Sequence, residues 1–84
     1  MKLEDPQSKQ MQKDYEQSDI ERLMGKREWR SYDEIINWLK KEGDNDRRFT
    51  PGEVQHMIDD FNKLKARKAQ FITDPGKLFQ ELKS

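Results

Sequence analysis

The sequence predicts an all-α protein, a small bundle of three to four helices with a long central helix and a flexible N-terminal arm. Its length of 84 residues suits one domain with a small core. Apolar residues recur at spacings of three and four, as on one face of a helix. Residues that favour the start of a helix precede these apolar runs. These capping residues are Ser18, Ser31, Thr50 and Asp74.

The composition limits the possible functions. Seventeen basic residues balance seventeen acidic ones, so the overall charge gives no reason to expect nucleic acid or an anionic membrane as partner. The absence of cysteine excludes disulfides, thiol catalysis and cysteine-ligated zinc. No signal-peptide-like segment or membrane-spanning apolar run occurs, and we therefore expect a cytoplasmic protein.

Residues 1–17 form the predicted arm, and residues 18–84 the single helical domain. Met11 and Tyr15 are spaced to share a helix face, but polar and charged residues surround them. This composition favours a flexible segment. The alternative is that the arm folds onto a partner and uses Met11 and Tyr15 as anchors.

A first helix is predicted over residues 19–26, where Ser18 and Glu21 have the spacing of a capping box. In a capping box, the two side chains each accept a hydrogen bond from the other residue's backbone N–H. A second helix is predicted over residues 32–42, where Ser31 and Glu34 repeat the pattern. Gly43 is placed to end that second helix.

The long central helix has the clearest start. Thr50 and Glu53 form a third capping box, and Pro51 occupies the first helical position, where its missing N–H is not needed. Phe49 and Val54 occupy the positions of a hydrophobic staple, which fixes how the chain enters the helix.

The end of the central helix is open to two interpretations. Lys65 and Lys68 fall on its apolar face and interrupt the stripe, which resumes at Phe71. We favour a continuous helix over residues 51–70. The alternative is a helix that stops near Lys68, followed by an extended segment over residues 69–73.

A last helix is predicted over residues 75–83, with Asp74 or Thr73 as its cap and Pro75 at its first position. The alternative is a β-hairpin that turns at Asp-Pro-Gly. The helical spacing of the residues after Pro75 favours the helix.

The predicted core combines the apolar faces of these helices with three aromatic residues, Trp29, Phe71 and Phe79. Trp38 lies at the margin of its helix face, so it is either a core residue or a hot spot for a partner. The helical and staple residues of the core are Ile20, Leu23, Met24, Tyr32, Ile35, Ile36, Leu39, Phe49, Val54, Met57, Ile58, Phe61 and Leu64.

Calcium, metal and catalytic sites are not supported. Asp44 and Asp46 lie between two helices, but the fifth ligand position of an EF-hand would be Arg48. His56 has two aspartates nearby in sequence, which is fewer ligands than a transition-metal site needs. No nucleophile has an evident base, and no phosphate-binding loop occurs. We predict no enzyme, no cofactor and no small-molecule substrate.

We therefore expect a small non-enzymatic adaptor or regulatory protein that binds another protein or a second copy of itself. The central helix is predicted to extend beyond the helices that cover it, so its far end needs a partner. The predicted partner-binding residues are Leu64, Lys65, Arg67, Lys68, Phe71, Ile72, Leu78 and Phe79.

The alternative function is DNA binding by a motif like the helix-turn-helix, because the basic residues cluster near the central helix. The connection over residues 43–50 is longer than the usual turn of this motif, and acidic residues flank the second helix. The predicted nucleic-acid contacts are Arg47, Arg48, Lys63, Lys65, Arg67 and Lys68.

Overall fold

The structure, a computed structural model, describes residues 14–84. This part of the chain is helical and contains no strand, which confirms the all-α prediction. Its elements are α2 (Gln17–Met24), α3 (Tyr32–Glu42), the short 3-10 helix η1 (Gly43–Asn45), α4 (Pro51–Ala66) and α5 (Pro75–Leu82).

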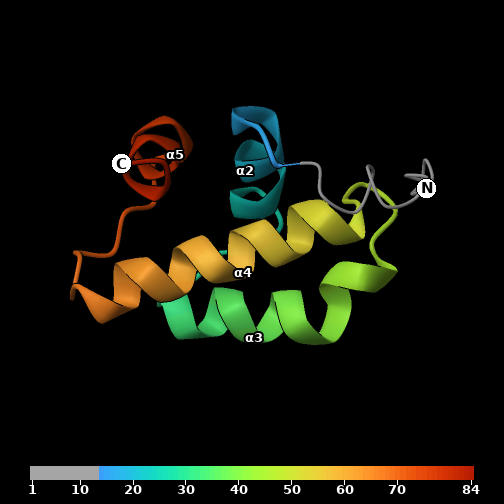
Figure 1. The fold of residues 1–84 in the computed structure, drawn as a ribbon, viewed down its shortest axis with the longest axis horizontal. Helices are drawn as coiled ribbons and strands as arrows, with labels where there is room; N and C mark the ends of the chain where they lie inside the picture. The colour runs from blue at the N-terminus through green and yellow to red at the C-terminus, as the bar shows by residue number, and fades with distance from the viewer. Residues whose placement is uncertain (1–13) are drawn as a thin grey trace, which may run out of the picture.

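The helices form two layers. The central helix α4 runs alongside α3, while α2 and α5 lie on the other side of α4, with α5 seen nearly end-on (Figure 1). Helix α5 contacts both α2 and α4, so it joins the first helix of the described chain to the central one.

Helix α2 starts and ends two residues earlier than predicted. Ser18 was the predicted cap, but Glu16 occupies this position, and its N–H donates to the Asp19 carboxylate at 2.8 Å. Asp19 is buried and also pairs with Arg22. Asp19 thus accepts the hydrogen bond from the cap residue's N–H, which was the role predicted for Glu21. Gly25 follows the helix as its C-cap.

The residues just before α2 pack with the domain. Tyr15 was placed in the predicted arm, but its side chain is 2% exposed and belongs to the core. Its ring meets Phe79 edge-on at a centroid distance of 5.8 Å. The rest of the predicted arm, which includes Met11, lies outside the described residues.

Helix α3 has the predicted bounds. The Ser31 hydroxyl accepts a hydrogen bond from the Glu34 N–H at 3.3 Å, whereas the Glu34 carboxylate accepts from the Arg30 N–H. Gly43 follows the helix as predicted, but in a right-handed conformation that continues into η1. A Cβ atom at this position would lie 2.9 Å from the Val54 side chain, so close packing against α4 requires glycine here.

Helix α4 starts as predicted and ends earlier. The Thr50 hydroxyl accepts from the Glu53 N–H at 3.2 Å, and the Glu53 carboxylate accepts from the Thr50 N–H at 2.8 Å. The favoured helix over residues 51–70 is wrong, because α4 ends at Ala66. The alternative, an end near Lys68, is correct.

The end of α4 is a Schellman motif, in which a left-handed residue reverses the chain. Lys68 has a φ of 57°, and its N–H donates to the Lys65 carbonyl. The Ala69 N–H donates to the Leu64 carbonyl at 3.0 Å. Tyr32 then holds the extended chain that follows. These tertiary contacts outweigh the helical spacing of the sequence.

Helix α5 confirms the predicted last helix, with Leu82 as its last residue. Asp74 is its cap, and the Asp74 carboxylate accepts a hydrogen bond from the Lys77 N–H at 3.0 Å. The alternative β-hairpin is therefore wrong.

The core contains most of the predicted residues and three more, Tyr15, Leu78 and Leu82. Four predicted core residues and the marginal Trp38 are only partly buried against it, because they lie at its edges. The partly buried predictions are Met24, Ile58, Phe71 and Phe79. Among the described helices, none has both the length and the apolar character required to cross a bilayer.

Candidate functional site

The predicted partner-binding surface is largely covered by the protein itself. Leu64 and Leu78 are 1% and 0% exposed, so neither side chain is available to a partner in this fold. Phe71, Ile72 and Phe79 are partly buried against the same core. Helix α4 is shorter than expected, because it ends at Ala66, and α5 contacts it. Leu64 near its end is therefore covered within the chain, without a partner.

The lysine that interrupted the apolar stripe has a partner inside the protein. Lys65 pairs with Asp33, which lies in the first turn of α3. Arg67 donates to the Glu81 carboxylate at 2.8 Å and to the Glu81 carbonyl at 3.1 Å, which connects the end of α4 to α5. Ion pairs between helices therefore explain the positions of Lys65 and Arg67. Within residues 14–84, Lys68 has no ion pair.

The predicted nucleic-acid contacts do not form one patch. Arg47 and Arg48 precede the first residue of α4, whereas the other four lie near its end, about 18–24 Å further along the helix axis. Arg48 pairs with Asp46, and Lys63 lies 3.8 Å from Asp60. Four of the six predicted cations thus have a carboxylate close by.

A different surface is built around Trp38. The Trp38 ring meets Trp29 and Phe49 edge-on, at centroid distances of 6.0 and 6.4 Å. The indole N–H of Trp29 donates to the Leu23 carbonyl at 2.8 Å, which anchors the loop between α2 and α3. Trp38 is therefore held in place on one side and partly exposed on the other.

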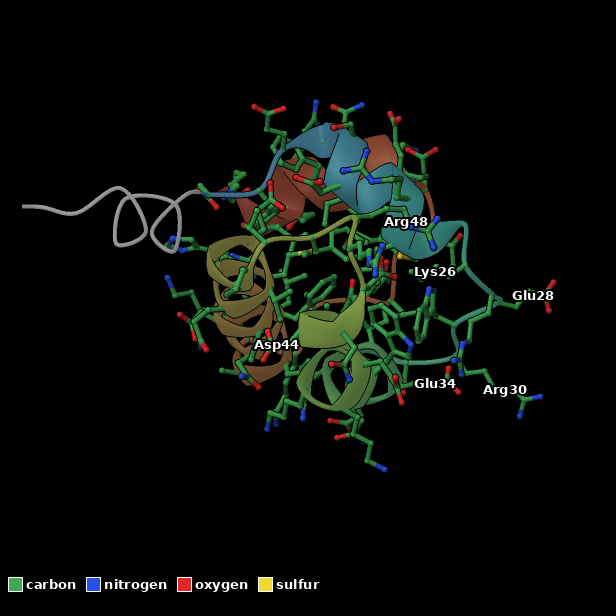
Figure 2. All side chains as sticks on the ribbon, turned by 90° about the vertical axis from the view of Figure 1, so that its right-hand side faces the viewer. Lys26, Glu28, Arg30, Glu34, Asp44 and Arg48 are labelled. Atoms are coloured by element: carbon green, nitrogen blue, oxygen red, sulfur yellow. The ribbon has the colours of Figure 1, made fainter. Side chains whose placement is uncertain are left out.

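Charged residues fix the same loop to the rest of the domain. Lys26 lies 5.0 Å from the centroid of the Trp38 ring and pairs with Asp46 at 2.6 Å. The hydrogen bonds from Lys26 and from the Arg48 N–H lower the pKa of Asp46 to about 2. Figure 2 shows Lys26 and Arg48 close together against the body, whereas Glu28 and Arg30 point away from it.

Three shallow cavities adjoin one another on this surface. Their volumes are about 370, 300 and 280 Å³, and Arg27 contributes to the lining of all three. Trp38 and Glu42 line the second and third, and Lys41 lines the second. Arg27 also lies over the Trp29 ring, 4.9 Å from its centroid. We call the exposed part, made of Arg27, Asn37, Trp38, Lys41 and Glu42, the Arg27–Trp38 surface.

One indication of this surface is present in the sequence, namely the position of Trp38 at the margin of its helix face. The contribution of Arg27 could not be inferred, because Arg27 lies in a loop that has no periodicity. Its neighbourhood depends on how Trp29 anchors that loop.

A second cluster of charged groups joins the N-terminal segment to α4 and α5. The Tyr15 hydroxyl donates to the Asp60 carboxylate at 2.6 Å, and Lys83 lies 2.6 Å from Asp14 and 3.6 Å from Asp60. Burial and the Asp60 carboxylate raise the pKa of Tyr15. Burial alone would raise the pKa of Asp14, but hydrogen bonds from Lys83 and the Tyr15 N–H lower it.

This cluster is a structural contact and lacks the features of a reactive site. The raised pKa keeps the Tyr15 phenol protonated, and its proton is committed to Asp60. Asp59, one of the two aspartates near His56 in the sequence, accepts a hydrogen bond from Gln55 at 3.0 Å. Over residues 14–84, no group of three histidine or acidic side chains is placed to hold a metal ion.

Comparisons of the chain with models of protein families, with curated protein sequences and with solved structures found no match.

Proposed function

We propose that this protein is a small non-enzymatic adaptor or regulator that binds another protein through the Arg27–Trp38 surface. The observation that carries the proposal is the position of Arg27 in all three adjoining cavities, with a partly exposed tryptophan beside it. Tryptophan and arginine are the residues most enriched among those that dominate binding energy at protein interfaces.

Packing within the chain also holds Trp38 in place without a partner. Trp38 packs between Trp29 and Phe49, and Lys26 is held over its ring by the ion pair with Asp46. Binding therefore costs little side-chain entropy at this position. Asn37, Lys41 and Glu42 surround the ring with groups that donate and accept hydrogen bonds. This pattern of an apolar centre and a polar rim is typical of protein interfaces.

The predicted surface at residues 64–79 has less support, because two of its apolar residues are buried and two of its cations are paired. The Arg27–Trp38 surface replaces it in this proposal. The expected partner is still another protein.

The proposal is tested by capturing binding proteins from the native host with the wild-type chain and three variants. Arg27→Glu and Lys41→Glu reverse the charge of two residues that line the cavities. Lys40→Glu is the matched control, because Lys40 is the exposed neighbour of Lys41 and lines none of these cavities. Melting followed by circular dichroism confirms that all variants remain folded.

We expect one or more proteins to bind the wild type and the Lys40→Glu variant and to be lost with both surface variants. Each reversal should weaken binding about tenfold or more, as for a residue at the centre of an interface. Retention of every partner by Arg27→Glu and Lys41→Glu would contradict the proposal. Equal loss with Lys40→Glu would show that overall charge, rather than this surface, controls binding.

A further inference from the structure

The connection between α4 and α5 contains a backbone conformation that its residue does not favour. Lys68 has a φ of 57°, in the left-handed region where glycine is the preferred residue. The sequence across this point continues the apolar spacing of α4, with Phe71 in register with its stripe. Local preference thus favours a longer helix, and the observed fold opposes it.

Contacts with the rest of the domain hold the connection in its observed path. The Tyr32 hydroxyl donates to the Gln70 carbonyl at 2.6 Å and accepts from the Ile72 N–H at 3.0 Å. The Phe71 ring meets the Tyr32 ring at 5.0 Å. Arg67 and Glu81 form an ion pair between α4 and α5. Ala69, Phe71 and Ile72 also pack against the core. Tyr32 makes both of the hydrogen bonds from α3 and the ring contact.

Relaxation of Lys68 into a helical conformation would redirect α5. In Figure 1 the chain leaves the end of α4, turns back, and places α5 beside α2. A helix that ran on through residues 67–72 would add about 9 Å to α4 and carry α5 away from its own α2. Leu78 and Leu82, which are buried in the observed fold, would then be exposed to water.

A second copy of the chain provides the surface that fits the displaced α5. We propose that two copies can form a dimer by exchanging α5, with residues 67–74 as the hinge. Each α5 then packs on α2 and α4 of the other copy, so its contacts are the same as in the monomer. Exchange removes the left-handed conformation of Lys68 in both copies. Because two chains must associate, the fraction of exchanged dimer rises with protein concentration. A strained hinge favours such an exchange.

This inference is independent of the proposed function. The five residues of the Arg27–Trp38 surface lie in α3 and in the loop before it, outside the hinge. The first cavity borders the hinge through Thr73, but no hinge residue lines the second or third, so exchange leaves those two unchanged. A result on one proposal therefore does not decide the other.

Two substitutions at the hinge test the proposal in opposite directions. Lys68→Gly favours the left-handed conformation and should stabilise the monomer, whereas Lys68→Ala favours the helix and should stabilise the dimer. Light scattering after size-exclusion chromatography, over a range of concentrations up to millimolar, gives the dimer dissociation constant. We expect the constant of the alanine variant to be lower than that of the glycine variant by about tenfold or more. Monomers throughout, or equal constants for the two variants, would overturn the proposal.

A charge-reversed pair distinguishes exchange from an ordinary side-by-side dimer. Asp14 lies before the hinge and Lys83 after it, and the two are paired in the fold. One chain carries Asp14→Lys and the other Lys83→Asp, both with Lys68→Ala. In a mixed exchanged dimer, each α5 meets an opposite charge, and in the unmixed dimers each meets a like charge.

With equal amounts of the two chains, random pairing makes the mixed dimer as abundant as the two unmixed dimers together. We expect the ratio of mixed to unmixed dimers to exceed this value by up to about fivefold when native mass spectrometry resolves the three species. A statistical distribution of the three dimers would overturn the exchange of α5.

Discussion

Gly43 illustrates how a single residue sets the distance between two helices. It is buried at the end of α3, and a Cβ atom there would lie 2.9 Å from Val54 Cγ1 and 3.3 Å from its Cγ2. The φ of −57° is available to any residue, so packing rather than backbone conformation demands glycine. Glycines at helix ends are usually explained by the left-handed conformation, and Gly43 is a case where that explanation does not apply.

At this scale we expect Gly43→Ala to lower the free energy of unfolding by about 1–3 kcal/mol, because Val54 or the helices must move to accommodate the methyl group. Gly76→Ala is the matched control. Gly76 lies in α5, where an added Cβ would meet other atoms only at 3.5 Å or more. The helix preference of alanine should therefore leave stability unchanged or raise it by up to about 1 kcal/mol.

Urea denaturation of both variants measures the difference. Equal stabilities of the two variants would show that α3 and α4 separate without cost at Gly43.

At the scale of elements, the fold depends on how one side chain of α3 organises the connection between α4 and α5. Tyr32 was predicted as a core residue of its helix, and its ring packs against Phe61 and Phe71 as such a residue should. Its hydroxyl has an additional role, since it satisfies backbone groups 38 and 40 residues away. The extended path of residues 69–74 therefore depends on α3.

We expect Tyr32→Phe to destabilise the protein by about 1–3 kcal/mol, because the Gln70 carbonyl and the Ile72 N–H each lose a partner. The measurement is amide hydrogen exchange, in which Ile72 should lose protection more than residues in the middle of α3. Unchanged protection of the Ile72 amide would show that the hydroxyl does not hold the connection. Tyr15→Phe, which removes a hydrogen bond to Asp60 instead, serves as a control for loss of a tyrosine hydroxyl.

At the scale of the whole molecule, ion pairs connect segments that are distant in sequence. Lys26 and Asp46 join the loop after α2 to the loop before α4, and Lys83 joins the end of α5 to Asp14. The carboxylates of Asp46 and Asp14 both have a lowered pKa in the folded protein. A lowered pKa means that the folded state binds the proton less readily than the unfolded state.

The Lys26–Asp46 ion pair makes the stability of the fold depend on pH. The contribution of Asp46 to stability is present above its unfolded pKa of 3.8 and is lost as the pH falls through the folded value of about 2. We expect Asp46→Asn to reduce the loss of stability between pH 4 and pH 2, measured by denaturation at each pH. Asp44→Asn, an exposed neighbour without an ion pair in the described part of the chain, should retain the wild-type dependence. Equal pH profiles for Asp46→Asn and the wild type would contradict the role of the Lys26–Asp46 pair.

Features that depend on neighbouring residues could be predicted from the sequence. The starts of α3, α4 and α5 were predicted because Ser31, Thr50 and Asp74 act on backbone groups three residues away. The helical spacing also identified most of the core, because residues spaced three or four apart share one face. The start of α2 was harder to predict, because two acidic residues could form its capping box. Asp19 forms it in place of Glu21, since Asp19 is also buried and paired with Arg22.

Features that depend on residues distant in the sequence became evident only in the folded protein. The end of α4 depends on Tyr32, and the burial of Tyr15 depends on Asp60, 45 residues away. Of the candidate surface, only the marginal position of Trp38 was evident in the sequence. Its combination with Arg27 arises from packing between α3 and a loop. The physical reason is that caps and periodicity are local, whereas the hydrogen bonds and ring contacts that select among local alternatives form only when the helices meet.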